Sequence, residues 1–283
     1  MLQNETQETT RWRVLKFGGT SVASRERWIR IAEILRSRTS EGFAVALVCS
    51  AISGVTDLLS ELVVTRRKGL DISALLDTLE ARHHKLGKEL GINAQAILAG
   101  DFETLRTLLS SSNIAPRAEA AIIGHGELMS TRLGAAWLSK NDVPCAWVDA
   151  RELLIANTYP QDDASKYLCA TCSPAPDEEV QSRLARRAQI IVTQGFIAAS
   201  EEGETVLLGR GGSDTSAAYI ACLLAAEKLE IWTDVPGLFT ANPRLIPEAR
   251  LLRRIGYRGA QALGALGAKV LHPRAIEAVW EHG

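Results

Sequence analysis

The sequence predicts an α/β fold: a three-layer αβα sandwich built on an open, mainly parallel sheet. Short apolar runs alternate with segments of helical periodicity, as in right-handed βαβ crossovers. The run at 43–49 is apolar throughout, which is typical of a strand buried on both faces. Glycine, serine and charged residues follow strands at 18–21, 50–54, 209–214 and 233–237. Because ligands bind at the carboxyl ends of parallel strands, one crevice is expected to collect these loops.

Composition limits the function classes. The chain has 283 residues with a net charge of −1, which suits one large α/β domain or two small ones and argues against nucleic acid or an anionic membrane as partner. No apolar run approaches the ~20 residues needed to span a bilayer. Residues 1–11 are expected to form a flexible tail without the pattern of a signal peptide. Five scattered cysteines fit a reducing cytosol, so a cytoplasmic location is expected.

Each element follows from local pattern. Strands are expected at the apolar runs 12–17, 43–49, 143–148, 190–193, 205–208 and 228–233. Apolar residues at helical spacing predict a helix with Trp28, Ile31, Ala32 and Leu35 on one face. The stretch 55–111 is expected to be helical, with breaks at Gly69 and Gly91. A long helix is expected from Pro116 to about Asn141, and two further helices are expected near 257–266 and 274–282. The polar stretch 157–176 is expected to be a loop, and His83 and His84 are expected on a solvated helix face.

The stretch Val206–Asp214 has the composition of an anion-binding strand, loop and helix start. An apolar strand end is followed by three glycines, which permit a tight turn and the close approach of a ligand. Two helix-capping residues come next, and the N–H groups and dipole of a helix N-terminus attract anions. Arg210 suits a carboxylate or a phosphate, although a surface arginine in a tight connection is the alternative. The glycines are Gly209, Gly211 and Gly212, and the caps are Ser213 and Asp214.

A second candidate phosphate ligand is Lys16, near the end of the first strand and just before Gly18 and Gly19. A point charge above open N–H groups suits a nucleotide phosphate, whereas a strand-end lysine that reaches solvent is the alternative. The Walker A pattern is absent, and so is a G-x-G-x-x-G with an acidic residue at the expected distance. A nicotinamide enzyme is therefore disfavoured.

The segment Gly124–Ser130 is unusual inside a long helix, because each glycine costs about 1 kcal/mol relative to alanine. Glu127 lies at the centre of a stripe of small and polar residues. A buried carboxylate needs a cationic partner. A substrate ammonium would serve, and Arg132 is a structural alternative.

Cations recur late in the chain, at Arg244 and Lys269. Two further cations near the same crevice fit a polyphosphate ligand, although either alone could be surface charge. The sequence lacks a serine or cysteine nucleophile paired with a histidine. These residues together fit phosphoryl transfer, which depends on positioning and charge neutralisation rather than on a covalent enzyme intermediate.

From residue 13 onward the chain resembles the aspartokinases, within the amino-acid kinase superfamily. The matching segments occur in the family's order: Lys16–Ser21, Ser50–Thr56, His125–Ser130, Gln194–Phe196, Gly209–Asp214, Trp232–Gly237 and Gly267–Pro273. Several amino-acid kinases carry the first and fifth of these segments. The segments His125–Ser130, Trp232–Gly237 and Gly267–Pro273 point to aspartokinases. The resemblance implies the amino-acid kinase, or carbamate kinase-like, fold.

The resemblance also implies a reaction: ATP-dependent phosphorylation of the L-aspartate side chain to 4-phospho-L-aspartate, the first step toward lysine, threonine and methionine, with Mg²⁺ as the metal. Lys16 would contact the transferring phosphate, and Asp214 and Glu127 would each either orient Lys16 or bind the substrate ammonium. The implied substrate-binding residues are Thr56, Glu127, Phe196, Arg210 and Ser213. The implied nucleotide-binding residues are Lys16, Gly18, Gly19, Ser21, Gly211, Gly212, Thr233, Asp234, Phe239, Arg244 and Lys269.

Three departures from the family pattern qualify the expectation. Phe239 stands where a tyrosine is frequent, and Asn242 stands where an aspartate is usual. Aspartokinases usually continue into a last strand and ACT regulatory domains, whereas this sequence stops at Gly283. One catalytic domain is expected at 12–283, ending before its last strand, either truncated or joined to a further domain, and assembled as a homodimer.

Two other functions stay open at this point. One is a kinase for another acidic amino acid such as glutamate. The other is a nucleotide-binding module without turnover.

Overall fold

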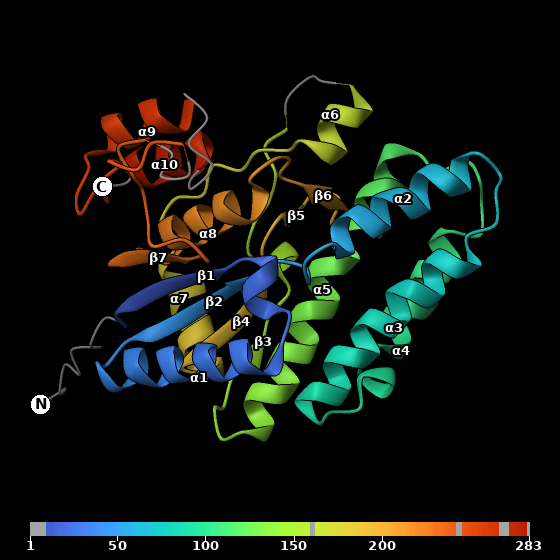
Figure 1. Cartoon of the computed structure of the whole chain (residues 1–283), viewed down its shortest axis with the longest axis horizontal. Helices are drawn as coiled ribbons and strands as arrows, with labels where there is room; N and C mark the ends of the chain where they lie inside the picture. The colour runs from blue at the N-terminus through green and yellow to red at the C-terminus, as the bar shows by residue number, and fades with distance from the viewer. Residues whose placement is uncertain (1–9, 159–161, 242–244, 266–271, 282–283) are drawn as a thin grey trace, which may run out of the picture.

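The computed structural model describes residues 10–158, 162–241, 245–265 and 272–281. Its centre is a five-stranded sheet in the order β3-β4-β2-β1-β7, and every pairing in it is parallel. The strands are β1 (Trp12–Phe17), β2 (Ala44–Cys49), β3 (Ala146–Trp147), β4 (Ile190–Gln194) and β7 (Lys228–Trp232). Helices cover both faces of this sheet, which confirms the predicted fold class (Figure 1).

Apart from a short helix at 163–168, the α-helices of the described residues fall into three groups. A first group packs on one sheet face: α1 (Arg25–Ser40) and α5 (Pro116–Lys140). A second group packs on the other face: α7 (Glu178–Arg187), α8 (Gly212–Leu223) and α10 (Pro273–Glu281), with α9 (Tyr257–Ala265) beside α10. The third group, α2 (Val55–Arg67), α3 (Ser73–Leu90) and α4 (Ala94–Leu108), extends from the sheet and packs on α5 (Figure 1).

Strand alternation divides the interior into two cores. Leu15 and Phe17 of β1 belong to the core beneath α1 and α5, whereas Val14 faces the core beneath α8. All six residues of β2 are buried, as the continuous apolar run predicted. Because apolar side chains leave β2 on both faces, this strand lies inside the sheet rather than at its edge.

The helical predictions are largely confirmed. The stretch 55–111 forms α2, α3 and α4, with Gly69 and Gly91 in the connections and both in the left-handed region. The long helix expected from Pro116 is α5, with proline in its first turn, where the missing N–H has no helical partner to lose. α9 and α10 lie where the last two helices were expected.

One strand was assigned to the wrong sheet. The segment expected at 205–208 forms β6 (Thr205–Leu207), which pairs antiparallel with β5 (Ile197–Ala199) in a separate two-stranded sheet. The reason is the short connection between these strands, which suits a hairpin, whereas a parallel pairing needs a crossover of about a dozen residues or more. The hairpin places the end of β6 directly before the glycine loop.

Two local expectations were also wrong. The stretch 157–176 is not wholly loop, because it contains α6 (Asp163–Leu168), whose first turn is capped by the Asp162 carboxylate at 3.0 Å from Ser165 N. His83 is fully buried rather than solvated. α3 packs against α2, α4 and α5, and these helices enclose His83. The His83 ring packs against the Phe102 ring in an edge-to-face arrangement. Burial lowers the pKa of His83 to about 4.

Candidate functional site

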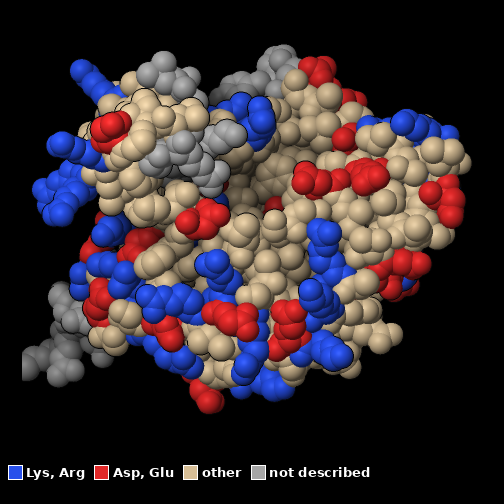
Figure 2. Space-filling view, in the orientation of Figure 1, with Lys and Arg blue, Asp and Glu red and all other residues tan. Residues whose placement is uncertain are grey.

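A cavity of about 720 Å³ lies where the loops after β1, β2 and β6 meet. Three of the four predicted loops, 18–21, 50–54 and 209–214, contribute to its lining, together with Lys16 and Glu127. The hollow is visible near the centre of the face shown in Figure 2, with side chains of both charge signs around it. The expected convergence of distant loops is thus confirmed for these three.

Lys16 and Asp214 form an ion pair inside this cavity, with Nζ 2.6 Å from Oδ1. Lys16 comes from β1 and Asp214 from the first turn of α8, and their side chains are only 13% and 16% exposed. A carboxylate in the first turn of a helix is stabilised by the helix dipole. The pair therefore fixes the ammonium group of Lys16 at the point where α8 begins.

The glycine loop has the conformation that its composition predicted. Gly209 and Gly211 have φ values of 71° and 69°, a region that favours glycine. One detail was wrong: Gly211, not Ser213 or Asp214, is the N-cap of α8, so these two residues lie in its first turn and point side chains into the cavity. The helix N-terminus thus faces the cavity, as an anion site requires.

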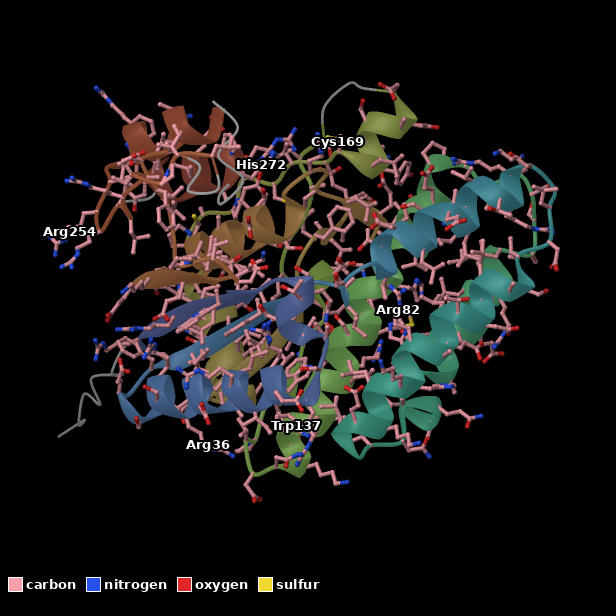
Figure 3. The ribbon with its side chains drawn as sticks, viewed as in Figure 1. Arg36, Arg82, Trp137, Cys169, Arg254 and His272 are labelled. Carbon is pink, nitrogen blue, oxygen red and sulfur yellow. The ribbon has the colours of Figure 1, made fainter. Side chains whose placement is uncertain are left out.

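The outer side of the glycine loop is covered by two residues labelled in Figure 3, His272 and Cys169. A Cβ added to Gly211 would lie 2.4 Å from Cγ of His272, and one added to Gly209 would lie 2.8 Å from Sγ of Cys169. Glycine is therefore required here by crowding as well as by φ.

Glu127 lies at the floor of the cavity and is 2% exposed. Its Oε1 accepts one hydrogen bond, from Ala51 N at 3.2 Å, while its Oε2 is buried without a hydrogen-bond partner among the described residues. Burial raises the pKa of Glu127 to about 8. A buried carboxylate in this state lacks the cation that would stabilise its charge.

The structural alternative for that cation is not realised. Arg132 turns away from Glu127: its Nε lies 3.2 Å from Asp101 Oδ2, and its guanidinium stacks over the Trp147 ring at 4.1 Å. Within the described part of the chain, Glu127 therefore has no protein cation at ion-pair distance.

The glycines of α5 explain how Glu127 comes so close to the loop after β2. A Cβ at Gly126 would lie 2.9 Å from Cβ of Ala51, and one at Gly134 would lie 2.0 Å from the Trp28 ring. α5 can approach both β2 and α1 only without these side chains. The intrinsic cost of glycine in a helix is offset by this close packing.

Phe196 forms another wall of the cavity. Its φ of 69° lies in the left-handed region, which is uncommon for an aromatic residue and marks a constrained position. The hydroxyl of Ser216 accepts a hydrogen bond from Phe196 N at 3.0 Å and holds this conformation. Thr56, Ser213 and the exposed Arg210 line the same cavity.

The remaining predicted nucleotide residues are less central. Ser21, Thr233, Asp234 and Phe239 are not among the described residues that line this cavity. The turn after β7 still starts at the same sheet edge, because Trp232 is paired with Phe17 and their rings stack at 5.9 Å. Arg244 and Lys269, as well as Asn242, lie outside the described residues.

Sequence reasoning missed Asp57 and Glu119, two acidic residues that line the cavity from the starts of α2 and α5. The available signal was their position: each lies in the first turn of a predicted helix. In the described ranges, no group of three or more His, Cys, Asp or Glu side chains is arranged to hold a metal ion.

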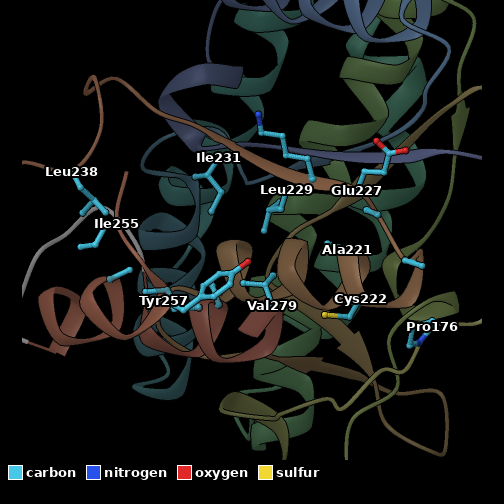
Figure 4. Close-up of a pocket in the computed structure, with 16 residues that line it drawn as sticks. Pro176, Ala221, Cys222, Glu227, Leu229, Ile231, Leu238, Ile255, Tyr257 and Val279 are labelled. Carbon is cyan, nitrogen blue, oxygen red and sulfur yellow. The ribbon is translucent and has the colours of Figure 1, made fainter. Parts of the chain in front are cut away.

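A second cavity, of about 500 Å³, lies between β7, α8 and the last two helices (Figure 4). Its lining is mostly apolar and includes Leu229, Ile231, Ile255 and Val279. It shares no lining residue with the cavity of Lys16 and Glu127. The glycine loops and the Lys16–Asp214 pair thus belong to the first cavity and not to this one.

Comparison with known proteins decides the family. The amino acid kinase family matches residues 11–283. The chain belongs to the amino acid kinase family. Among the helices of the described ranges, none combines the length and hydropathy that crossing a bilayer would require.

Within this family the chain is homologous to aspartokinases. It is 33% identical to the lysine-sensitive aspartokinase 3 of Escherichia coli over 93% of this chain and 58% of that protein. It is 35% identical to a chloroplastic bifunctional aspartokinase/homoserine dehydrogenase of Zea mays, over 96% of this chain and 30% of that protein. This amino acid kinase chain thus spans less than two thirds of either relative.

A solved structure agrees with this assignment. The E. coli aspartokinase III in complex with aspartate and ADP is 31% identical, with a TM-score of 0.80 over 95% of this chain and 60% of that chain. The lysine- and aspartate-bound form of the same enzyme has a TM-score of 0.76 and is 30% identical, over the same shares of each chain.

Proposed function

We propose that this chain phosphorylates the side-chain carboxylate of L-aspartate with ATP, giving 4-phospho-L-aspartate and ADP, the first step toward lysine, threonine and methionine. The observation that carries the proposal is the cavity itself, where the Lys16–Asp214 pair and Arg210 lie with the buried Glu127, which has no cation partner in the described ranges. Homology to aspartokinases, including one crystallised with aspartate and ADP, supports the choice of substrate.

The two acidic residues take different roles in this proposal. Asp214 already pairs with Lys16, so it orients that ammonium group. Glu127 has a buried oxygen without a hydrogen-bond partner among the described residues, so it receives the substrate ammonium. Arg210 would then bind the α-carboxylate, because its planar fork matches two carboxylate oxygens. Thr56, Phe196 and Ser213 line the same cavity and would enclose the rest of the substrate, including its side chain.

The chemistry needs no general base. A free aspartate side chain has a pKa of about 3.9 and is ionised at neutral pH. One of its oxygens attacks the γ-phosphorus, the bond from that phosphorus to the bridging oxygen of ADP breaks, and no proton has to move. The obstacle is repulsion between two anions. Lys16 and the N-terminus of α8 supply preorganised positive charge at that point.

Magnesium fits this site as a companion of the nucleotide. Mg²⁺ usually keeps several waters and binds through one or two carboxylates plus substrate phosphates. The described residues offer no larger cluster of metal ligands, but Asp57 and Glu119 line the cavity. When bound, the ion would neutralise phosphate charge, and Asp57 would hold its water shell, because Glu119 is already paired with Arg67 at 2.6 Å.

The nucleotide itself is assigned to the loops at the same sheet edge. Gly18, Gly19, Gly211 and Gly212 would approach the phosphates, since their backbone lines the cavity. The base and ribose are assigned to the turn after β7. The residues proposed there are Thr233, Asp234 and Phe239. Ser21 in the loop after β1, together with Arg244 and Lys269, completes the proposed nucleotide-binding set.

Aspartate-dependent release of ADP tests the proposal, with hydroxylamine trapping of the acyl phosphate to identify the product. Turnover with glutamate instead of aspartate would favour the kinase for another acidic amino acid. ATP binding by calorimetry without any turnover would favour a nucleotide-binding module. A homodimer located in the cytoplasm is part of the same proposal, and sedimentation velocity tests its assembly.

A further inference from the structure

Gln194, the last residue of β4, connects three elements through its side chain and is fully buried. Its Oε1 accepts a hydrogen bond from Ala150 N at 2.7 Å. Its Nε2 donates to Thr131 Oγ1 at 2.9 Å and to Val148 O at 3.5 Å. A side-chain amide placed this way is satisfied at both ends, so its orientation is fixed.

Thr131 links Gln194 by hydrogen bonds to the turn of α5 that carries Glu127. Its Oγ1 lies 2.8 Å from Glu127 O, to which it donates, while it accepts from Gln194 Nε2 and from Trp147 Nε1 at 3.0 Å. Both lone pairs and the proton of this hydroxyl are therefore in use. The backbone of Glu127 is tied to β4 through one hydroxyl.

The chain after Gln194 continues to Phe196, which forms another wall of the cavity. Gly195 follows at once, its N donating to Cys49 O at 2.9 Å, and a Cβ at Gly195 would lie 2.7 Å from Cβ of Ser213. Phe196, with its positive φ, comes next. Gln194 thus lies on a covalent and hydrogen-bonded connection between Glu127 and Phe196.

We propose that Gln194 is a positioning residue that, through Thr131, sets the distance between Glu127 and the Phe196 wall and thereby the affinity for the amino-acid substrate. The inference rests on the proposed function, because the substrate measured is L-aspartate. Gln194 touches no substrate: it is not among the residues that line the cavity.

The test compares Gln194→Met, which keeps length and loses both hydrogen bonds, with the wild-type chain. We expect KM for aspartate to rise about tenfold while kcat and KM for ATP stay within about threefold, because binding is lost rather than transition-state stabilisation. A purely structural role would lower the active fraction, and so kcat, without changing KM.

The control is Gln189→Met, just before the same strand at its other end, where the amide nitrogen donates to Phe43 O at 3.1 Å and Thr39 O at 3.4 Å. It should leave both KM values unchanged. Thr131→Val provides the second variant: it should raise KM for aspartate by a similar factor, and the double variant should not exceed the larger single effect.

Four outcomes are decisive. No aspartate-dependent ADP release by the wild-type chain overturns the proposed function and this inference with it. Wild-type activity with an unchanged KM in Gln194→Met overturns the inference alone, as do fully additive effects of the two variants. If Gln194→Met does not fold, an unchanged KM in Thr131→Val overturns the inference.

Discussion

Lys16 Nζ lies 2.6 Å from Asp214 Oδ1, which joins the first strand of the sheet to the N-terminus of α8. The pair is largely shielded from solvent, so salt should weaken it less than a surface ion pair. Its position at the carboxyl end of β1 connects the fold to the proposed chemistry.

Lys16→Ala should lower kcat by at least ~10²-fold, the effect of removing one preorganised charge donor. Steady-state ADP release measures it. Lys228→Ala, an exposed lysine on β7, is the matched control and should leave kcat unchanged. Turnover near wild type in the Lys16 variant would remove this residue from the mechanism.

Asp214→Asn and Glu127→Gln should have different kinetic effects. Loss of the Asp214 charge releases Lys16 from its position, and misplacement by about 1 Å can cost about 10²-fold, so kcat should fall. Loss of the Glu127 charge removes the partner of the substrate ammonium, so KM for aspartate should rise instead. Both parameters are measured with aspartate varied at saturating ATP. The reverse pattern would exchange the two assigned roles.

The affinity for aspartate should depend on pH through Glu127. Its pKa is raised to about 8 by burial, so the carboxyl is mainly neutral at pH 7 and ionises as the pH rises through 8. The substrate ammonium requires the ionised form, so KM for aspartate should fall between pH 6.5 and 8, and binding near pH 7 should release a proton. Calorimetry in buffers of different ionisation enthalpy detects that proton, and Glu127→Gln should abolish it.

The same raised pKa predicts a change in folding stability. Between the ordinary glutamate pKa of 4.5 and about 8, the unfolded chain loses this proton while the folded chain keeps it. The contribution of Glu127 to stability should therefore be largest below pH 4.5 and should decrease as the pH rises to 8. Denaturant unfolding of wild type and Glu127→Gln at both ends of this range measures the difference.

Two glycine substitutions should have opposite effects on stability. Gly134→Ala places a Cβ 2.0 Å from the Trp28 ring and should destabilise the fold by about 1–3 kcal/mol. Gly100→Ala, in the middle of α4, has no atom within 4 Å of the added Cβ and should stabilise by up to about 1 kcal/mol. Urea unfolding measures both. Equal effects would contradict close packing of α5 on α1.

Part of the site could be predicted because its signals are local. Gly209 and Gly211 precede a helix and follow a strand, so a loop that approaches a ligand was inferred from composition alone. Lys16 beside Gly18 was interpreted as a candidate phosphate ligand for the same reason, and the structure places it in the same cavity. The convergence of these loops followed from the rule that parallel strands end at one edge of a sheet.

Other features depend on which distant residues meet. Glu127 and Arg132 lie on one helix and could have paired, but Asp101 from α4 pairs with Arg132 instead. Helical periodicity could not place His83 in the interior, because that depends on three neighbouring helices. The connections of Gln194 are likewise invisible in sequence, since its partners come from α5 and the segment after β3.

The sequence alone determined most of the order of strands and helices (though not β5, α6 or α7), the buried central strand, the glycine loop and the family resemblance, because each is encoded by residues close together in the chain. The tertiary structure alone decided that Asp214 holds Lys16, that Glu127 has no cation partner among the described residues, and that β6 leaves the main sheet. Burial and charge pairing depend on the competition among all groups that folding brings into contact, and that competition is settled only in three dimensions.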